Sequence, residues 1–287
     1  MTKCHVCFRH CELSEGSIGF CGARIGLSDK VAASNYGRIT SLALDPIEKK
    51  PLRRFFPGTK ILSVGSYGCN LRCPFCQNSE ISWGEEARRF SETADTITPE
   101  ILVRIAEKYR SEGNIGIAYT YNEPLVGYEF VRDTAKLAQE KGLKNVLVTN
   151  GTAELPVLYE IAPYIDAMNI DLKGFTGSYY DDVLGGCFEM TKRFIEEAVK
   201  FCHIELTTLI VPRENDSEDE MRELSSWIAG LKDKEGRIIG KIVPLHISRF
   251  FPRFHMTDRS ATSVALIYKL ADIAREKLDY VYTGNCR

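Results

Sequence analysis

From residue 60 onward, strand-like runs alternate with helix-like stretches, and this alternation constrains the fold more than any other feature of the chain. The strand-like runs are rich in valine, isoleucine and leucine, as strands that are buried on both faces are. The expected strands cover residues 61–65, 114–121, 145–149, 167–172, 204–211, 241–247 and 280–283, and the expected helices cover about 98–111, 125–141, 154–162, 191–201, 217–231 and 260–277. Repeated strand–helix units predict an α/β fold with parallel strands, closed as a partial or complete (β/α) barrel.

Composition and charge limit which kinds of partner we expect the protein to bind and where in the cell we expect it. Of the 287 residues, 44% are apolar and 26% are charged, which is ordinary for a folded chain with a sizeable core. With 37 basic and 39 acidic residues the formal charge is −2, which gives no long-range attraction to nucleic acid or anionic lipid. No apolar run approaches the roughly 18 residues of a membrane helix, and the start lacks the apolar stretch of a signal peptide. We therefore expect a cytoplasmic protein with no nucleic acid and no membrane as a partner.

The chain has 10 cysteines, and most of them fall in two groups with the spacing of metal ligands. In a reducing cytosol, metal binding explains such groups better than disulfides do. Cys187, Cys202 and Cys286 stand apart from both groups, and we expect them to be packed or surface residues.

One group, Cys69, Cys73 and Cys76, lies directly after the first expected barrel strand with the spacing Cys-x3-Cys-x2-Cys. Gly68 and Pro74 mark this stretch as a loop. A structural zinc ion normally takes four protein ligands, whereas a 4Fe–4S cluster held by three cysteines leaves one iron free to bind another molecule. The spacing favours such a cluster over the alternatives, which are three buried free cysteines or part of a zinc site.

The other group is Cys4-x2-Cys7-x3-Cys11-x9-Cys21, in a stretch with little periodicity. A segment this short buries too little apolar surface to be stable without a cross-link such as a bound metal. We therefore expect a small cysteine-rich, metal-binding segment over residues 1–56, followed by the barrel domain over 57–287. Four cysteines suit either a structural zinc ion or a second iron–sulfur cluster, with zinc slightly favoured, and unligated cysteines remain the alternative.

Polar residues follow several of the expected strands. In a (β/α) barrel the C-terminal ends of the strands meet at one rim, where catalytic groups gather. The polar residues expected at this rim are Asn122, Glu123, Thr149, Asn150, Gly151, Asp171, Lys173 and His246. Taken singly, each has a structural explanation, such as a turn, a solvated ion pair or a carboxylate at the start of a helix. Their arrangement on separate strand ends predicts a single site.

The cysteine loop resembles that of the radical S-adenosylmethionine (SAM) superfamily, in which an aromatic residue stands just before the last cysteine, as Phe75 does here. This resemblance implies a 4Fe–4S cluster and S-adenosylmethionine as cofactors. It also implies reductive cleavage of that molecule to methionine and a 5′-deoxyadenosyl radical, which takes hydrogen from a protein or small-molecule substrate. A one-electron donor such as flavodoxin or ferredoxin would supply the electron.

Within the superfamily the chain looks most like pyruvate formate-lyase activating enzyme and its relatives. Those proteins carry Thr-Asn-Gly after the third strand and Asp-x-Lys after the fourth, and a Gly-Gly-Glu-like motif after the second. The matching positions here are Thr149, Asn150 and Gly151, Asp171 and Lys173, and Tyr121, Asn122 and Glu123. The resemblance implies that these residues contact the methionine end of the cofactor, with Glu123 as the main anchor of its ammonium. Phe75 and His246 are also expected to bind the cofactor.

A closer likeness extends over nearly the whole chain. Asp45–Leu52, Pro57-Gly58 and Cys76–Ser82, together with the cysteine-rich start, resemble the radical enzyme of the AmmeMemoRadiSam system. The sequence leaves the hydrogen donor open, because the expected substrate loops 174–190 and 248–258 carry no motif. One alternative is an activase that installs a glycyl radical in a pyruvate formate-lyase-like partner. An alternative of another class is a non-catalytic binding module stapled by zinc.

Overall fold

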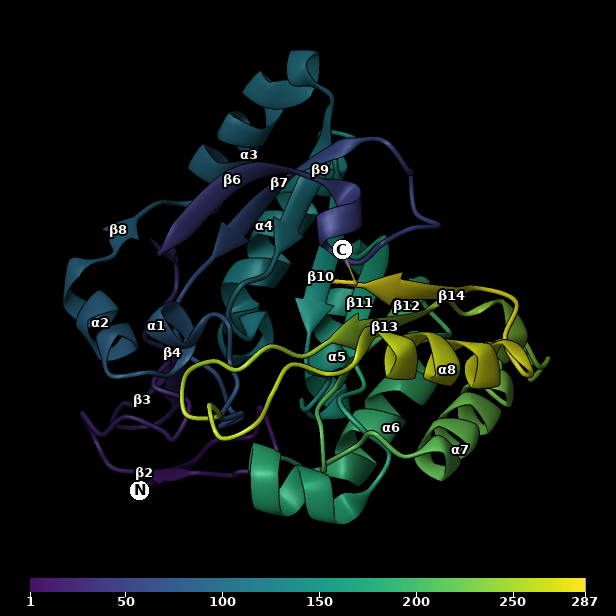
Figure 1. Ribbon diagram of the computed structural model, residues 1–287. Coiled ribbons are helices and arrows are strands. Elements are labelled where there is room, and N and C mark those ends of the chain that lie inside the picture. The colour runs from purple at the N-terminus through teal and green to yellow at the C-terminus, as the bar shows by residue number, and fades with distance from the viewer. Residues whose placement is uncertain (287) are drawn as a thin grey trace.

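The computed structural model describes residues 1–286 and is built on one curved eight-stranded sheet (Figure 1). The strand order is β14-β13-β12-β11-β10-β9-β7-β6. Seven strands run parallel: β7 (Lys60–Gly65), β9 (Asn114–Tyr119), β10 (Lys144–Thr149), β11 (Ala167–Asp171), β12 (His203–Ile210), β13 (Leu245–Arg249) and β14 (Val281–Gly284). The edge strand β6 (Ser41–Pro46) pairs antiparallel with β7. The expected α/β fold with parallel strands is confirmed, in the form of a partial barrel.

Helices flank this sheet, and most follow a strand, as the alternation predicts. The longer helices are α3 (Pro99–Lys108), α4 (Tyr128–Glu140), α5 (Leu155–Ile161), α6 (Phe188–Ala198), α7 (Glu218–Ala229) and α8 (Val264–Arg275). Thr98 and Ser217 begin α3 and α7 by accepting a hydrogen bond from the third residue that follows each of them. In residues 1–286, no helix combines the length and the apolar character needed to span a bilayer.

Two strands differ from the expectation by more than one residue. The strand expected at 241–247 begins at Leu245, because Gly240–Ile242 forms a 3-10 turn (η7) and Pro244 has no backbone N–H to contribute to a ladder. The strand expected at 114–121 ends at Tyr119, since Tyr121 takes a positive φ of 74° and turns the chain out of the sheet.

The cysteine-rich start forms short two-stranded ladders beside the cysteine loop. These pair β1 (Thr2–Lys3) with β2 (Glu12–Leu13), β3 (Arg24–Gly26) with β4 (Val31–Ala33), and β5 (Arg38–Ile39) with β8 (Asp95–Thr96). The edge strand β6 also falls inside the expected segment 1–56 but belongs to the main sheet. The division at residue 56 therefore stays a prediction about folding units, since strands from both parts pair in one sheet.

Residues 47–55, which we call the plug, close the end of the barrel where the strands begin. Ile47, Leu52 and Phe55 pack against inward-facing side chains of four parallel strands, namely Ile61, Ala118, Val146 and Ala167. The backbone N–H groups of Arg53 and Arg54 donate to the buried carboxylate of Glu205 on β12 (2.9 and 2.7 Å). With this end filled, the opposite end, where the cysteine loop lies, is left to bind ligands.

Candidate functional site

The cysteine loop follows β7 and is fixed to the end of β10 by side-chain amides. The Asn150 side chain donates to the side-chain oxygen of Asn70 (2.9 Å) and lies 3.8 Å from the sulfur of Cys69. Asn70 in turn donates to the backbone oxygen of Thr152 (2.9 Å). Both asparagines are buried, so these bonds are protected from water. The structure thus brings Asn150, at the end of β10, next to the first cysteine of the loop.

Tyr121 takes the place of a glycine in the family motif and adopts a glycine-like backbone, with φ at +74°. Its carbonyl accepts a hydrogen bond from the side chain of Asn78 (2.8 Å), just beyond the last loop cysteine. Its hydroxyl donates to Asp45 (2.8 Å), and the Lys50 ammonium lies 4.7 Å from the centre of its ring. Burial raises the pKa of Tyr121 to about 12, and the Asp45 carboxylate adds to the effect. These contacts hold a conformation that a tyrosine rarely takes.

Asn122 organises the backbone that leads into the first cysteine. Its side-chain oxygen accepts from the N–H of Ser66 (3.0 Å), and its amide donates to the carbonyls of Tyr67 and Gly68 (both 3.1 Å). The side chain of Asn122 is therefore committed to the protein, and it acts on the site through the loop.

Glu123 is buried and joins the ends of β9 and β10. Its carboxylate accepts hydrogen bonds from the Thr149 hydroxyl (2.7 Å), the Asn150 N–H (2.8 Å) and the Leu125 N–H (3.0 Å). Burial raises the pKa of Glu123 to about 7, although these three donors oppose the rise. The resemblance implies that Glu123 anchors the cofactor's ammonium, and this role stays a prediction. In the structure its carboxylate holds the ends of β9 and β10 in position through these three protein donors.

Asp171 ends β11 beside the cysteine loop, and its side chain is 33% exposed. It accepts from the ammonium of Lys173 (2.8 Å). Burial would lower the pKa of Lys173, but the charges of Asp171 and the Cys73 thiolate raise it well above its usual value. Lys173 therefore keeps its positive charge, and the pair stands next to Cys73 with part of the Asp171 carboxylate exposed.

Burial raises the pKa values of two thiols in the cysteine loop. Burial raises the pKa of Cys73 to about 11 and that of Cys69 well above its usual value, with the Glu123 charge adding to the second shift. Thiols bind iron as thiolates, so the metal must displace these protons when it binds. Three cysteines from one loop would hold an iron–sulfur cluster and leave one iron without a protein ligand, with the Asn150 amide and the Asp171–Lys173 pair beside it.

Phe75 lies in the cysteine loop, in the same buried cluster as Cys73, and packs edge-to-face on Phe250 (ring centroids 6.2 Å apart), which anchors the loop after β13. One predicted residue lies apart from this group. His246 is the second residue of β13, so it lies near the start of that strand and not at its end as expected. Its ring nitrogen contacts Glu205 (2.6 Å), which also holds the plug. The structure therefore places His246 in the barrel interior with the plug.

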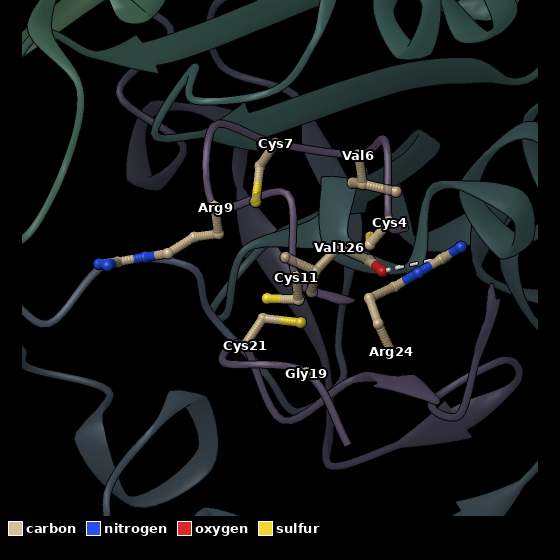
Figure 2. A pocket seen from close by; sticks show the side chains of 9 residues that line it. All are labelled: Cys4, Val6, Cys7, Arg9, Cys11, Gly19, Cys21, Arg24 and Val126. Atoms are coloured by element: carbon tan, nitrogen blue, oxygen red, sulfur yellow. Dashed lines mark hydrogen bonds between the residues drawn. The ribbon is translucent and has the colours of Figure 1, made fainter. Parts of the chain in front are cut away.

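The N-terminal cysteines Cys4, Cys7, Cys11 and Cys21 line one pocket with Val6, Arg9, Gly19, Arg24 and Val126 (Figure 2). Burial raises the pKa of Cys21 to about 12 and also raises that of Cys7, which accepts hydrogen bonds from the Arg9 backbone and the Asn70 side chain. Burial lowers the pKa of Arg9, against the opposing charges of Cys7, Cys11 and Cys69. This guanidinium is thus close to thiols of both cysteine groups.

Sequence reasoning missed several residues that shape the site. Arg9, Asn70 and Asn78 lie within or next to the cysteine spacings and carry no signal apart from that position. The loops without a motif also turn out to cover the cysteine loop. The carbonyl of Leu184 in a π-helical turn, η6 (Tyr179–Leu184), accepts from the Arg72 N–H (2.8 Å), and the His255 N–H donates to the carbonyl of Pro74 (2.9 Å).

Comparison with known proteins places this geometry in a family. Residues 63–225 match the model of the Radical SAM superfamily. An uncharacterized protein of Methanocaldococcus jannaschii is 39% identical over 287 residues, covering 99% of this chain and 81% of that protein. The pyruvate formate-lyase 1-activating enzyme of Escherichia coli is 24% identical over 185 residues, or 62% of this chain and 72% of the enzyme. That of Clostridium pasteurianum is 26% identical over 186 residues, or 62% of this chain and 73% of the enzyme.

Solved structures share the fold at low identity. SuiB of Streptococcus suis, in its crystal structure bound to S-adenosylmethionine, has a TM-score of 0.57 and 13% identity, and the match covers 78% of this chain and 51% of SuiB. This chain therefore matches about half the length of SuiB. A radical SAM methyltransferase from Sphaerobacter thermophilus has a TM-score of 0.54 and 14% identity, covering 80% of this chain and 67% of the methyltransferase.

The closer likeness to the AmmeMemoRadiSam enzyme stays a prediction. The family match rules out the alternative of a non-catalytic binding module. The chain belongs to the Radical SAM superfamily and is an enzyme of radical SAM type, similar to pyruvate formate-lyase activating enzymes.

Proposed function

We propose that this protein cleaves S-adenosylmethionine reductively to start hydrogen abstraction from a substrate. The supporting observation is the assembly at one end of the barrel of three loop cysteines, the amide of Asn150, and the Asp171–Lys173 pair. Superfamily membership implies a 4Fe–4S cluster and S-adenosylmethionine here, and the donor set fits both. When bound and reduced, the cluster supplies the electron that breaks the carbon–sulfur bond of the sulfonium.

The chain's own residues hold and orient the cofactor. Cys69, Cys73 and Cys76 would hold the cluster, and the open part of Asp171 would accept hydrogen bonds from the cofactor's ammonium. Lys173 stays protonated beside Asp171, so it would attract the cofactor's carboxylate. Glu123 aligns Thr149 and Asn150 for this contact without being the main ammonium ligand. The loop after β13 covers the cysteine loop, because its Phe250 packs on Phe75 and the N–H of its His255 donates to the carbonyl of Pro74. This cover would limit the access of water to the site.

The substrate that best fits the similarity is another protein. Relatives named pyruvate formate-lyase activating enzymes support a protein substrate, with an activase that installs a glycyl radical as its specific form. We further propose a one-electron donor of the flavodoxin or ferredoxin class, and a cytoplasmic location as expected from the cysteine content. The four N-terminal cysteines would hold a second metal centre, either zinc or iron.

Substitution of Cys73 tests the proposal. Cys73→Ser should abolish cleavage of S-adenosylmethionine and leave the fold intact, because Cys73 is one of three cluster ligands and serine is nearly isosteric. The measurement is 5′-deoxyadenosine formed with dithionite after anaerobic reconstitution, and far-ultraviolet circular dichroism reports the fold. Cys202→Ser, at a cysteine outside both groups, is the matched control. Cleavage retained in the Cys73 variant would show that this loop is not the radical centre.

The substrate needs its own experiment. Deuterium transfer into 5′-deoxyadenosine, measured by mass spectrometry with deuterated candidate proteins and small molecules, identifies the hydrogen donor. Transfer from a glycine of a glycyl-radical enzyme would establish the activase, and transfer from a small molecule alone would exclude it.

A further inference from the structure

Three arginines from separate segments donate hydrogen bonds to the backbone carbonyls of the cysteine loop. The arginines are Arg9 in the cysteine-rich start, Arg72 in the loop itself and Arg253 in the loop after β13. The carbonyls, at 2.7–3.4 Å, belong to Asn70 for Arg9, to Cys69 and Leu71 for Arg72, and to Gln77 for Arg253. Because a carbonyl carries no net charge, these bonds order the guanidinium groups without cancelling their positive charge.

Aromatic rings join these arginines into one surface. The guanidinium groups of Arg9 and Arg72 both lie over the ring of Phe20, with their central carbons 3.6 and 3.8 Å from its centroid. Arg72 also lies 5.2 Å from the ring of Trp83, which packs edge-to-face on Phe254 (4.9 Å). The ring of Phe20 is 39% exposed. We call this surface the arginine face, and it comprises Arg9, Phe20, Arg72, Trp83, Arg253 and Phe254.

The arginine face carries positive charge on a chain whose formal charge is −2. Arg9 extends away from the N-terminal cysteines (Figure 2), and its second bond goes to the carbonyl of Gly185. Arg253 is exposed, and among residues 1–286 neither Arg9 nor Arg253 pairs with a carboxylate. Two guanidinium groups held over one ring repel each other, and a negatively charged partner would offset that repulsion. The face is therefore complementary to an acidic surface.

We propose that the arginine face is the docking surface for the one-electron donor, an acidic protein of the flavodoxin class. The exposed ring of Phe20 among positive charges fits a flavin edge that is surrounded by acidic side chains. On docking, the flavin loses one electron and the cluster at the cysteine loop gains it, with no proton transferred and no bond formed. A donor bound here lies over the carbonyls of that loop, which gives the electron a short path. This inference rests on the proposed function, since it requires a redox centre at the loop.

Stopped-flow reduction of the anaerobically reconstituted full chain by reduced flavodoxin tests the docking surface. Arg253→Glu reverses an exposed charge and should lower the second-order rate constant about tenfold at low ionic strength. Arg253→Lys keeps the charge and should keep most of the rate. Arg110→Glu is the matched control, because Arg110 is exposed, also donates to a carbonyl and precedes the start of β9, at the end of the sheet opposite the cysteine loop. Equal rate constants for the wild type and Arg253→Glu would overturn the proposal.

The charge of the reductant separates docking from a change in the cluster itself. Reduced methyl viologen is a cation, so it should reduce the Arg253→Glu variant at least as fast as the wild type. Slower reduction by both reductants would mean that the substitution alters the cluster, and would overturn the proposal. In calorimetric titration at low ionic strength, Arg253→Glu should weaken binding of oxidised flavodoxin to the reconstituted protein about tenfold, equal to about 1.4 kcal/mol. High salt should weaken binding to the wild type, because it screens the charges of the arginine face.

Formation of 5′-deoxyadenosine with methyl viologen as the reductant separates this inference from the proposed function. If the wild type cleaves S-adenosylmethionine with this reductant, while reduction by flavodoxin depends neither on salt nor on Arg253, only the docking surface is wrong. If the wild type forms no 5′-deoxyadenosine with either reductant, the proposed function itself fails.

Discussion

At the scale of single residues, Glu123 and Asp171 show where a motif and a structure differ. The sequence predicts both positions and names Glu123 as the main ammonium anchor, but that role depends on which protein donors reach each carboxylate. Glu123 receives three such donors and Asp171 keeps part of its surface open. Sequence therefore predicts which residues lie at the ends of the strands, and the side-chain contacts show which carboxylate is left partly exposed.

Calorimetric titration can separate these roles. Asp171→Asn should weaken binding of S-adenosylmethionine by roughly tenfold, equal to about 1.4 kcal/mol, with little change in stability, because it removes a partly exposed charge. Glu123→Gln should lower the free energy of unfolding by about 1–3 kcal/mol, since one buried N–H loses its acceptor. Its effect on binding should be the smaller of the two. A larger loss of affinity in the Glu123 variant, with unchanged unfolding, would restore Glu123 as the ammonium anchor.

Tyr121 is a second residue whose role the sequence could not give, because it replaces a glycine of the family motif. Tyr121→Phe keeps the ring against Gly65 and removes the hydrogen bond to Asp45. We expect a loss of about 1 kcal/mol in the free energy of unfolding by urea. Tyr268→Phe, on the exposed face of α8, should change it little. Equal effects from both substitutions would show that the Asp45 bond does not support the positive φ.

At the scale of elements, the alternating pattern predicted the order and type of the strands and helices from residue 60 onward. The exceptions have local causes, such as the 3-10 turn before β13. The plug and β6 were not predicted, because residues 41–55 have neither a helical nor an alternating pattern that is strong enough. Their structure depends on distant partners, above all Glu205, which no local signal in residues 41–55 can specify.

The plug gives a prediction about pH. Burial would raise the pKa of Glu205, but hydrogen bonds from His203, His246 and the two plug N–H groups lower it to about 2. A depressed folded-state pKa stabilises the fold above the unfolded value of about 4.5 and loses that effect as the pH falls toward 2. Glu205→Gln should therefore cost about 3 kcal/mol at pH 7 and at pH 5, and progressively less below pH 4.5.

Urea unfolding of the wild type and the Glu205→Gln variant at pH 7, 5 and 3.5 checks this expectation. The difference between the two proteins is the relevant quantity, because any effect of acid on a bound metal centre is common to both. A difference that stayed constant down to pH 3.5 would mean that the carboxylate charge does not hold the plug.

At the scale of the whole molecule, the plug determines when the barrel can be completed. Its contacts join residues that are far apart in sequence: Arg53 and Arg54 bond Glu205 across 152 and 151 positions, and the Arg54 side chain reaches the Tyr280 hydroxyl across 226. Contacts of such long range form late, because a large loop must close before they stabilise anything. A nascent chain that has not yet reached Glu205 has no partner for these two amides. In refolding followed by pulsed hydrogen exchange, the amides of Arg53 and Arg54 should therefore gain protection after those of β9 and β10, so that water leaves the barrel interior only in the last step of folding.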